Sequence, residues 1–295
     1  MLKLKSAIIQ QLKNNIWSVM FLSAVLMCAF SCMLTTVSYT NAGVWQSDSV
    51  LKLLFTKNIN SIALGNPTLS SDALIKVFPY SPWFSMLLIT CAAFPAVTLF
   101  ADEYYSGMFF FDISRVSVKK YSIVKYTSAL GSGMLAFFFG FLVYRTIVIL
   151  RFPGIEKYPK DVIESGETIT GNERLCFIYG FVLHVAIVTA IFVAIVMLLT
   201  TFIKDRYFLF GIPMLVLFFT ERLSIYVGSK NSAIYGEGNG WWNLAVLSNY
   251  INMYNTFEYN TGTRYYFFYV LAITEIIGIY VLFYIRIERR IKKNV

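Results

Sequence analysis

Three ionisable side chains stand inside long apolar stretches of the sequence. They are Arg145, His184 and Glu275. Glu275 and His184 could act together as an acid and a base, but no nucleophile or metal constellation accompanies them. Because charges at such depth are costly and are usually paired, we expect Glu275 to pair with His184 or with Arg145. A structural ion pair is favoured over a substrate or proton site.

Metal and nucleotide chemistry find little support in the sequence. Cys28 and Cys32 stand four residues apart and could hold a soft metal, but small apolar packing is favoured because no further thiol or imidazole cluster accompanies them. The single histidine excludes zinc motifs built on paired histidines. The sequence has no G-x-x-x-x-G-K-[ST] loop, no G-x-G-x-x-G after a strand and no G-x-S-x-G elbow. We therefore expect no catalytic residue, metal or cofactor in this chain.

The composition is that of a membrane protein. The 295 residues are 57% hydrophobic and 14% charged, whereas soluble domains carry about 25% charged residues. Apolar runs long enough to cross a bilayer as helices recur along the chain. We predict an all-α polytopic fold in one transmembrane domain, 1–295, with six spans at 16–39, 83–101, 126–150, 175–203, 207–223 and 265–285.

The basic residues predict which ends of the spans face the cytoplasm. Both termini and the links 102–125 and 204–206 carry the whole formal excess of +9, while the longer loops are balanced. The positive-inside rule then places both termini in the cytoplasm, and we expect the bacterial plasma membrane. Residues 1–15 gather their apolar side chains on one face, which predicts an interfacial helix. Nucleic-acid binding is disfavoured, because the bases lie at span ends rather than along a groove.

The link at residues 102–125, called here the coupling segment, is the most unusual stretch outside the predicted spans. Its first part reads DEYYSGMFFFDISRVSVKK and mixes acids, bases and aromatic residues. The apolar run Met108–Phe111 lies beside charged residues, and such a run is unfavourable if it is exposed to water. We therefore expect the segment to dock against another surface. In order along the chain it carries Glu103, Gly107, the pair Ser114–Arg115, and Lys125.

This order resembles the type 2 ABC export permeases, which carry an E-x-x-x-G segment, a Ser-Arg pair and a Lys between their second and third spans. The family usually has a basic residue within the acidic start and a small hydroxyl after the glycine. Here those places hold Tyr104–Tyr105 and Met108. The resemblance implies that residues 103–120 form a coupling helix in a cleft of a separate ATPase subunit, with this role assigned to Glu103, Gly107, Phe110, Ser114, Arg115, Ser117, Lys119 and Lys125.

The resemblance also implies partners. ATP and Mg²⁺ would bind the ATPase subunit, and a second permease copy or a related permease would complete the pathway in membrane lipid.

In the outer loop 224–264, residues 240–254 could form a re-entrant helix or a helix packed on the outer surface. Within the third predicted span, a stripe of small residues at four-residue spacing favours close helix packing: Ser128, Ser132, Ala136 and Gly140.

We therefore expect the permease subunit of an ABC exporter that moves a hydrophobic or amphipathic substrate, such as a peptide, toxin, drug or lipid, by alternating access. The chain itself is expected not to be an enzyme. The alternative is a non-transporting immunity or sensor subunit whose outer loops bind an extracellular peptide. An intramembrane enzyme is the least favoured class.

Overall fold

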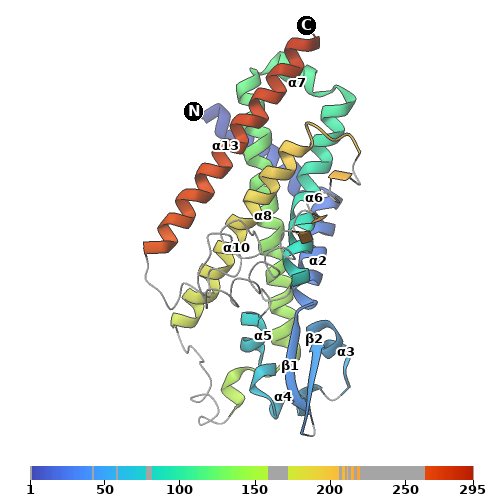
Figure 1. The fold of residues 1–295 in the computed structure, drawn as a ribbon, viewed down its shortest axis with the longest axis vertical. Coiled ribbons are helices and arrows are strands. Elements are labelled where there is room, and N and C mark those ends of the chain that lie inside the picture. The colour runs from blue at the N-terminus through green and yellow to red at the C-terminus, as the bar shows by residue number, and fades with distance from the viewer. Residues whose placement is uncertain are drawn as a thin grey trace, which may run out of the picture.

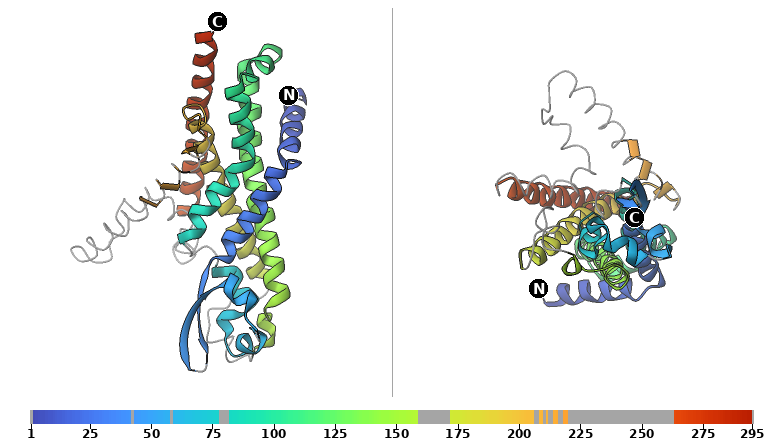
Figure 2. Two further views of the ribbon diagram at one scale, coloured as in Figure 1. Left: turned by 90° about the vertical axis from the view of Figure 1, so that its right-hand side faces the viewer. Right: turned by 90° about the horizontal axis from the view of Figure 1, so that it is seen from below.

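The computed structural model describes residues 2–41, 43–57, 59–77, 82–158, 172–205 and 263–294, with short pieces between 208 and 219. These residues form an elongated bundle of helices (Figure 1). Both termini and the short helix α7 lie at one end of the bundle, and a β-hairpin lies at the other (Figures 1 and 2). The long helices are α1 (Leu2–Ile16), α2 (Val19–Met33), α6 (Pro82–Ser106), α8 (Val118–Arg151), α10 (Asn172–Leu199) and α13 (Thr263–Asn294).

Within the described residues, three stretches of helix are long and apolar enough to cross a membrane: Val118–Arg151, Val182–Leu199 and Tyr269–Lys293. A fourth span results if α1 and α2, which bend by 69° at the break between them, count together. Ser18 caps α2 at this break, where its hydroxyl accepts a hydrogen bond from the Phe21 amide at 3.2 Å. The chain is thus mostly helical, and its apolar helices indicate a membrane protein.

The predicted first span runs too far along the chain. α2 ends at Met33, and β1 (Thr36–Asn41) then pairs antiparallel with β2 (Val44–Ser49). Gly43, with a φ of +80°, allows the tight turn between them. Val37 and Tyr39 alternate inward on β1 and are buried, which is the strand period rather than the helical one. The prediction of an all-α chain is therefore wrong in this segment.

The hairpin belongs to a small folded element at the far end of the bundle. It comprises the two strands, α3 (Val50–Phe55), α4 (Ile59–Leu64), the 3₁₀ turn η1 (Pro67–Leu69) and α5 (Ser71–Val77). Tyr144 of α8 is buried and donates a hydrogen bond to the Leu74 carbonyl at 2.9 Å, which fixes α5 to the bundle.

α8 lies at the centre of the bundle, where small residues let its neighbours approach. Ser128, Ser132, Ala136 and Gly140 are all buried. A Cβ added at Gly140 would lie 2.6 Å from the Cβ of Cys28 and 2.9 Å from the Val25 carbonyl oxygen, both on α2. The α2 backbone therefore comes so close to α8 at Gly140 that a larger side chain does not fit there.

The helices differ in length from the predicted spans. α8 begins at Val118 rather than at 126, so residues 118–125 of the coupling segment belong to the same helix as the third predicted span. α13 continues past 285 to Asn294. Most of the fifth span (207–223) and nearly all of the outer loop 224–264 with its re-entrant stretch lie outside the described residues. The count of six spans stays a prediction.

Candidate functional site

The coupling segment folds as a helix–turn–helix at the end of the bundle where both termini lie. α6 ends at Ser106, and Gly107 adopts a φ of +82° that L side chains rarely take. The short helix α7 (Phe109–Arg115) follows, and Ser117 leads directly into α8. The glycine thus reverses the chain, and α7 lies across the ends of α6 and α8 (Figure 1).

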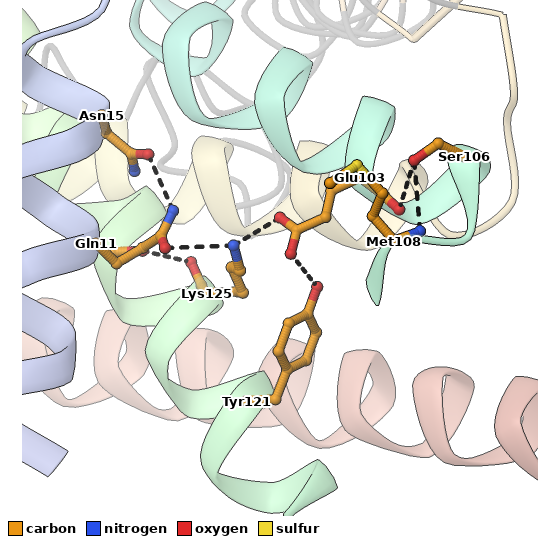
Figure 3. Close-up of polar contacts among 8 residues, drawn as sticks. Gln11, Asn15, Glu103, Ser106, Met108, Tyr121 and Lys125 are labelled. Atoms are coloured by element: carbon orange, nitrogen blue, oxygen red, sulfur yellow. Dashed lines mark hydrogen bonds and ion pairs between the residues drawn. The ribbon is translucent and has the colours of Figure 1, made fainter. Parts of the chain in front are cut away.

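A polar cluster behind this turn joins three helices (Figure 3). Lys125 of α8 donates a hydrogen bond within an ion pair to Glu103 of α6 at 2.6 Å, and both side chains are largely shielded, with exposures of 12% and 17%. The Tyr121 hydroxyl donates to the other Glu103 oxygen at 3.1 Å. Lys125 also donates to Gln11 of α1 at 3.3 Å, and Gln11 donates to Asn15 at 3.4 Å. Through Lys125, the amino-terminal helix is bonded to the turn that carries α7.

Burial controls the electrostatics of this cluster. Desolvation raises the pKa of Glu103, and a hydrogen bond with Asp112 of α7 raises it further. The positive charge of Lys125 and the hydrogen bond from Tyr121 oppose this shift without cancelling it. Lys125 and Tyr121 therefore favour the charged form of Glu103 against the cost of its burial.

Aromatic side chains fill the space beneath α7. Phe109 is fully buried, and its ring centroid lies 5.1 Å from that of Tyr104 and 4.0 Å from that of Phe110. Tyr105 donates a hydrogen bond to the Thr200 carbonyl at 2.8 Å, just beyond the end of α10. The inner face of the turn is therefore packed, and a change in the position of α7 must disturb these contacts.

The outer face of the turn carries a different set of side chains. Phe111 is 73% exposed, Met108 62% and Val116 43%. Exposed polar and basic side chains surround them: Ser114, Arg115, Ser117, Lys119 and Lys120. Exposed apolar side chains ringed by charge are typical of a surface that binds a protein.

The residues predicted for coupling thus divide into two groups. Glu103 and Lys125 face each other inside the turn, and Gly107 and Phe110 shape it. The group that faces outward comprises Ser114, Arg115, Ser117 and Lys119.

Sequence reasoning missed Tyr121, Gln11 and Asn15 in the polar cluster. One signal was present, because Gln11 and Asn15 are polar positions beside the apolar face of α1 that includes Leu12. Tyr121, in turn, precedes Lys125 by one helical turn.

The three ionisable residues inside predicted spans are not brought together as expected. His184 of α10 is 1% exposed, and its ring lies edge-on to that of Tyr269 at a centroid distance of 6.2 Å. Glu275 and Arg145 are half-buried. In the part of the chain that the structure describes, no ion pair or hydrogen bond joins Glu275 to His184 or Arg145.

The cysteines pack together more closely than the sequence indicated. Cys28 and Cys32 of α2 and Cys91 of α6 are buried in one apolar cluster. Among the described residues, no group of three or more cysteine, histidine or acidic side chains is placed to hold a metal ion. Apolar packing, the favoured interpretation of Cys28 and Cys32, agrees with this arrangement.

The chain was compared with protein families and with curated proteins, and neither comparison found a match. The class that the fold defines is therefore a mostly helical protein whose long apolar helices indicate insertion in a membrane.

Proposed function

We propose that this chain is the permease subunit of an ATP-driven exporter, and that the outer face of α7 is where a separate ATPase subunit docks. One observation carries the proposal: the inner face of the turn is held by buried contacts, whereas its outer face exposes apolar and basic side chains that a partner could bind. The Glu103–Lys125 pair and the ring of Phe109 hold the inner face. Phe111 and Arg115 lie exposed on the other. Contacts of this kind can pass a force applied to α7 on to the helices of the bundle.

In the proposed mechanism, a separate ATPase supplies the energy of ATP hydrolysis, and this chain forms part of the path that the substrate takes across the membrane. ATP and Mg²⁺ bind the ATPase, whose closure pushes on α7, and this chain catalyses nothing. The push passes from α7 to α6 through the hydrogen bond between Asp112 and Glu103. From Glu103 it passes to α8 through the ion pair with Lys125, and from Lys125 to α1 through the bond to Gln11. The half-bundle then rocks against a second permease copy or a related permease, and a hydrophobic or amphipathic substrate gains access to the outside.

The arrangement of the ends supports the orientation that this mechanism needs. The N-terminus, the C-terminus and α7 share one end of the bundle (Figure 2). Exposed Arg115, Lys119 and Lys120 give that end the basic character of a cytoplasmic face. We therefore place α7 in the cytoplasm and the folded element with the hairpin outside the cell.

Co-expression tests the proposal. The chain would be purified in detergent together with a phosphate-loop ATPase encoded beside its gene. Wild-type protein should retain the ATPase, and Arg115→Glu should lose most of it, because the substitution reverses a charge at the docking surface. Lys57→Glu makes the same charge change on an exposed residue at the opposite end of the bundle and should retain it. Equal retention by both variants, or none by wild type, would count against the proposal.

A second candidate rests on the folded element at the far end. Trp45 is 77% exposed, Val44 60% and Phe55 82%, although the buried residues of the element share one apolar core with the bundle. This surface favours a non-transporting immunity or sensor subunit that binds an extracellular peptide. A candidate peptide that binds the wild-type chain, with no ATPase present, and binds Trp45→Ala at least tenfold more weakly would support it.

A further inference from the structure

α7 is too short to hold its position alone. It has seven residues and follows a glycine with positive φ. Isolated helices shorter than about 12 residues are marginal in water, so the order of α7 depends on the contacts of its inner face. The residues that make those contacts decide where the outer face points.

The C-terminal helix contributes to the apolar cluster beneath α7. Phe283 and Ile287 of α13 are fully buried there, in one cluster with Phe100, Tyr104 and Phe109. The ring centroid of Phe283 lies 5.4 Å from that of Phe100. α6, α7 and α13 therefore share a single core at the end of the bundle where the termini lie.

Arg290 covers this core from the α13 side. Its guanidinium carbon lies 3.8 Å from the ring centroid of Tyr104, 5.1 Å from that of Phe109 and 5.5 Å from that of Tyr105. Positions 283, 287 and 290 lie on one face of a helix, so α13 presents two apolar side chains and then a cation to the turn. A cation within about 6 Å of an aromatic face is attracted to it, and more strongly where water is excluded.

We infer that Arg290 is a positioning residue that clamps the end of α6, through Tyr104, and α7, through Phe109, to α13, so that the coupling segment and the last helix move as one unit. The inference deepens the proposed function and rests on it for its consequence: a push on α7 reaches α13 directly, as well as α6 and α8.

The neighbouring arginines on α13 supply a control. Arg289 is exposed and Arg290 is half-buried. Arg286 stacks on a different ring, that of Phe202, at 3.8 Å. Arg289→Ala and Arg290→Ala therefore remove the same charge and the same side chain from adjacent positions, and only the second removes the clamp.

Hydrogen–deuterium exchange tests the clamp in the full-length chain in lipid nanodiscs, with no ATPase present. In Arg290→Ala, amides of residues 107–117 should exchange roughly 5- to 30-fold faster than in wild type, because the clamp opposes their local opening. Arg289→Ala should change them less than twofold. Arg290→Lys, which keeps the charge but not the planar stack, should give an intermediate rate.

Each result of the exchange experiment either supports or overturns the inference. Exchange in Arg290→Ala within twofold of wild type would overturn the inference. If Arg290→Ala raises exchange in every helix, the variant Tyr104→Leu decides, because it removes the aromatic ring but keeps an apolar side chain. Faster exchange confined to residues 107–117 in this variant supports the clamp. Unchanged exchange in those residues overturns it. Because the measurement needs no ATPase, failure of the exporter proposal in the co-expression experiment would leave this result standing.

Discussion

The ion pair between Glu103 and Lys125 allows a quantitative test of how the turn is held. Replacing Lys125 by Met leaves the Glu103 carboxylate in a desolvated site beside Asp112. Breaking a fully buried pair costs about 3–5 kcal/mol and an exposed pair contributes about 0–1 kcal/mol. With exposures of 12% and 17%, and a small, partly open pocket beside the pair, we expect a loss of about 1–3 kcal/mol in the free energy of unfolding.

A double-mutant cycle isolates the pair. Glu103→Gln, Lys125→Met and the double variant would be unfolded in mixed micelles of mild and denaturing detergent. The coupling free energy should be about 1–2 kcal/mol. The exposed pair Glu288–Lys292 on α13 is the matched control, and its cycle should give no coupling above experimental error. A Glu103–Lys125 coupling as small as that of the control would refute the view that this pair holds the turn.

The same variants carry a pH test whose sign follows from burial. The pKa of Glu103 is raised in the folded chain from an ordinary value of 4.5, so the folded state binds the proton more tightly than the unfolded state. The stability that this group contributes is complete below pH 4.5 and is lost as pH rises through the raised pKa. Without Lys125 the pKa rises further. The destabilisation of Lys125→Met should therefore grow from pH 5 to pH 8, and a pH-independent loss would contradict this reasoning.

Three further substitutions test the packing of the bundle and the turn. Gly140→Ala should lose about 1–3 kcal/mol of stability, because its Cβ would lie 2.6 Å from that of Cys28. The control Gly278→Ala meets nothing within 4 Å and should be neutral or stabilising. Equal effects of the two substitutions would contradict the packing. Gly107→Ala should cost about 1 kcal/mol through its φ of +82° alone, since the nearest side-chain atom is 3.9 Å away, and Gly107→Asn should cost less. Ser122 is fully buried and its hydroxyl has no hydrogen-bond partner in the described residues, so Ser122→Ala should be neutral or stabilise by up to about 1 kcal/mol; a clear loss in the same unfolding assay would reveal a partner.

Features with a local cause could be predicted from the sequence. The apolar runs predict long helices: α6, α8 and α13 include three of the six predicted spans, and α10, which ends at Leu199, includes most of the span predicted at 175–203. The break at Gly107 was not predicted: the resemblance implied one coupling helix over residues 103–120, whereas α6 ends at Ser106 and Gly107 takes the positive φ that glycine readily adopts. The small residues of α8 predict close helix contact.

Features that depend on tertiary contact could not be predicted. The hairpin was missed because only Val37 and Tyr39 alternate inward, and they directly follow an apolar run that reads as helix. Neither the pairing of Glu103 with Lys125 nor the stacking of Arg290 on Tyr104 has a signature in residue spacing, because each joins two different helices. Those contacts decide which charged side chains face inward and which remain available to a partner.

The central claim is that the outer face of α7 meets a nucleotide-hydrolysing subunit, and site-specific photocrosslinking tests it most directly. A photoreactive amino acid would replace Phe111, which is 73% exposed on α7, or Trp45, which is 77% exposed on the hairpin, in membranes that contain the co-expressed ATPase. The account predicts an adduct with the ATPase from position 111 and none from position 45. An adduct from position 45 alone, or none from position 111 while the two proteins still co-purify, would contradict it.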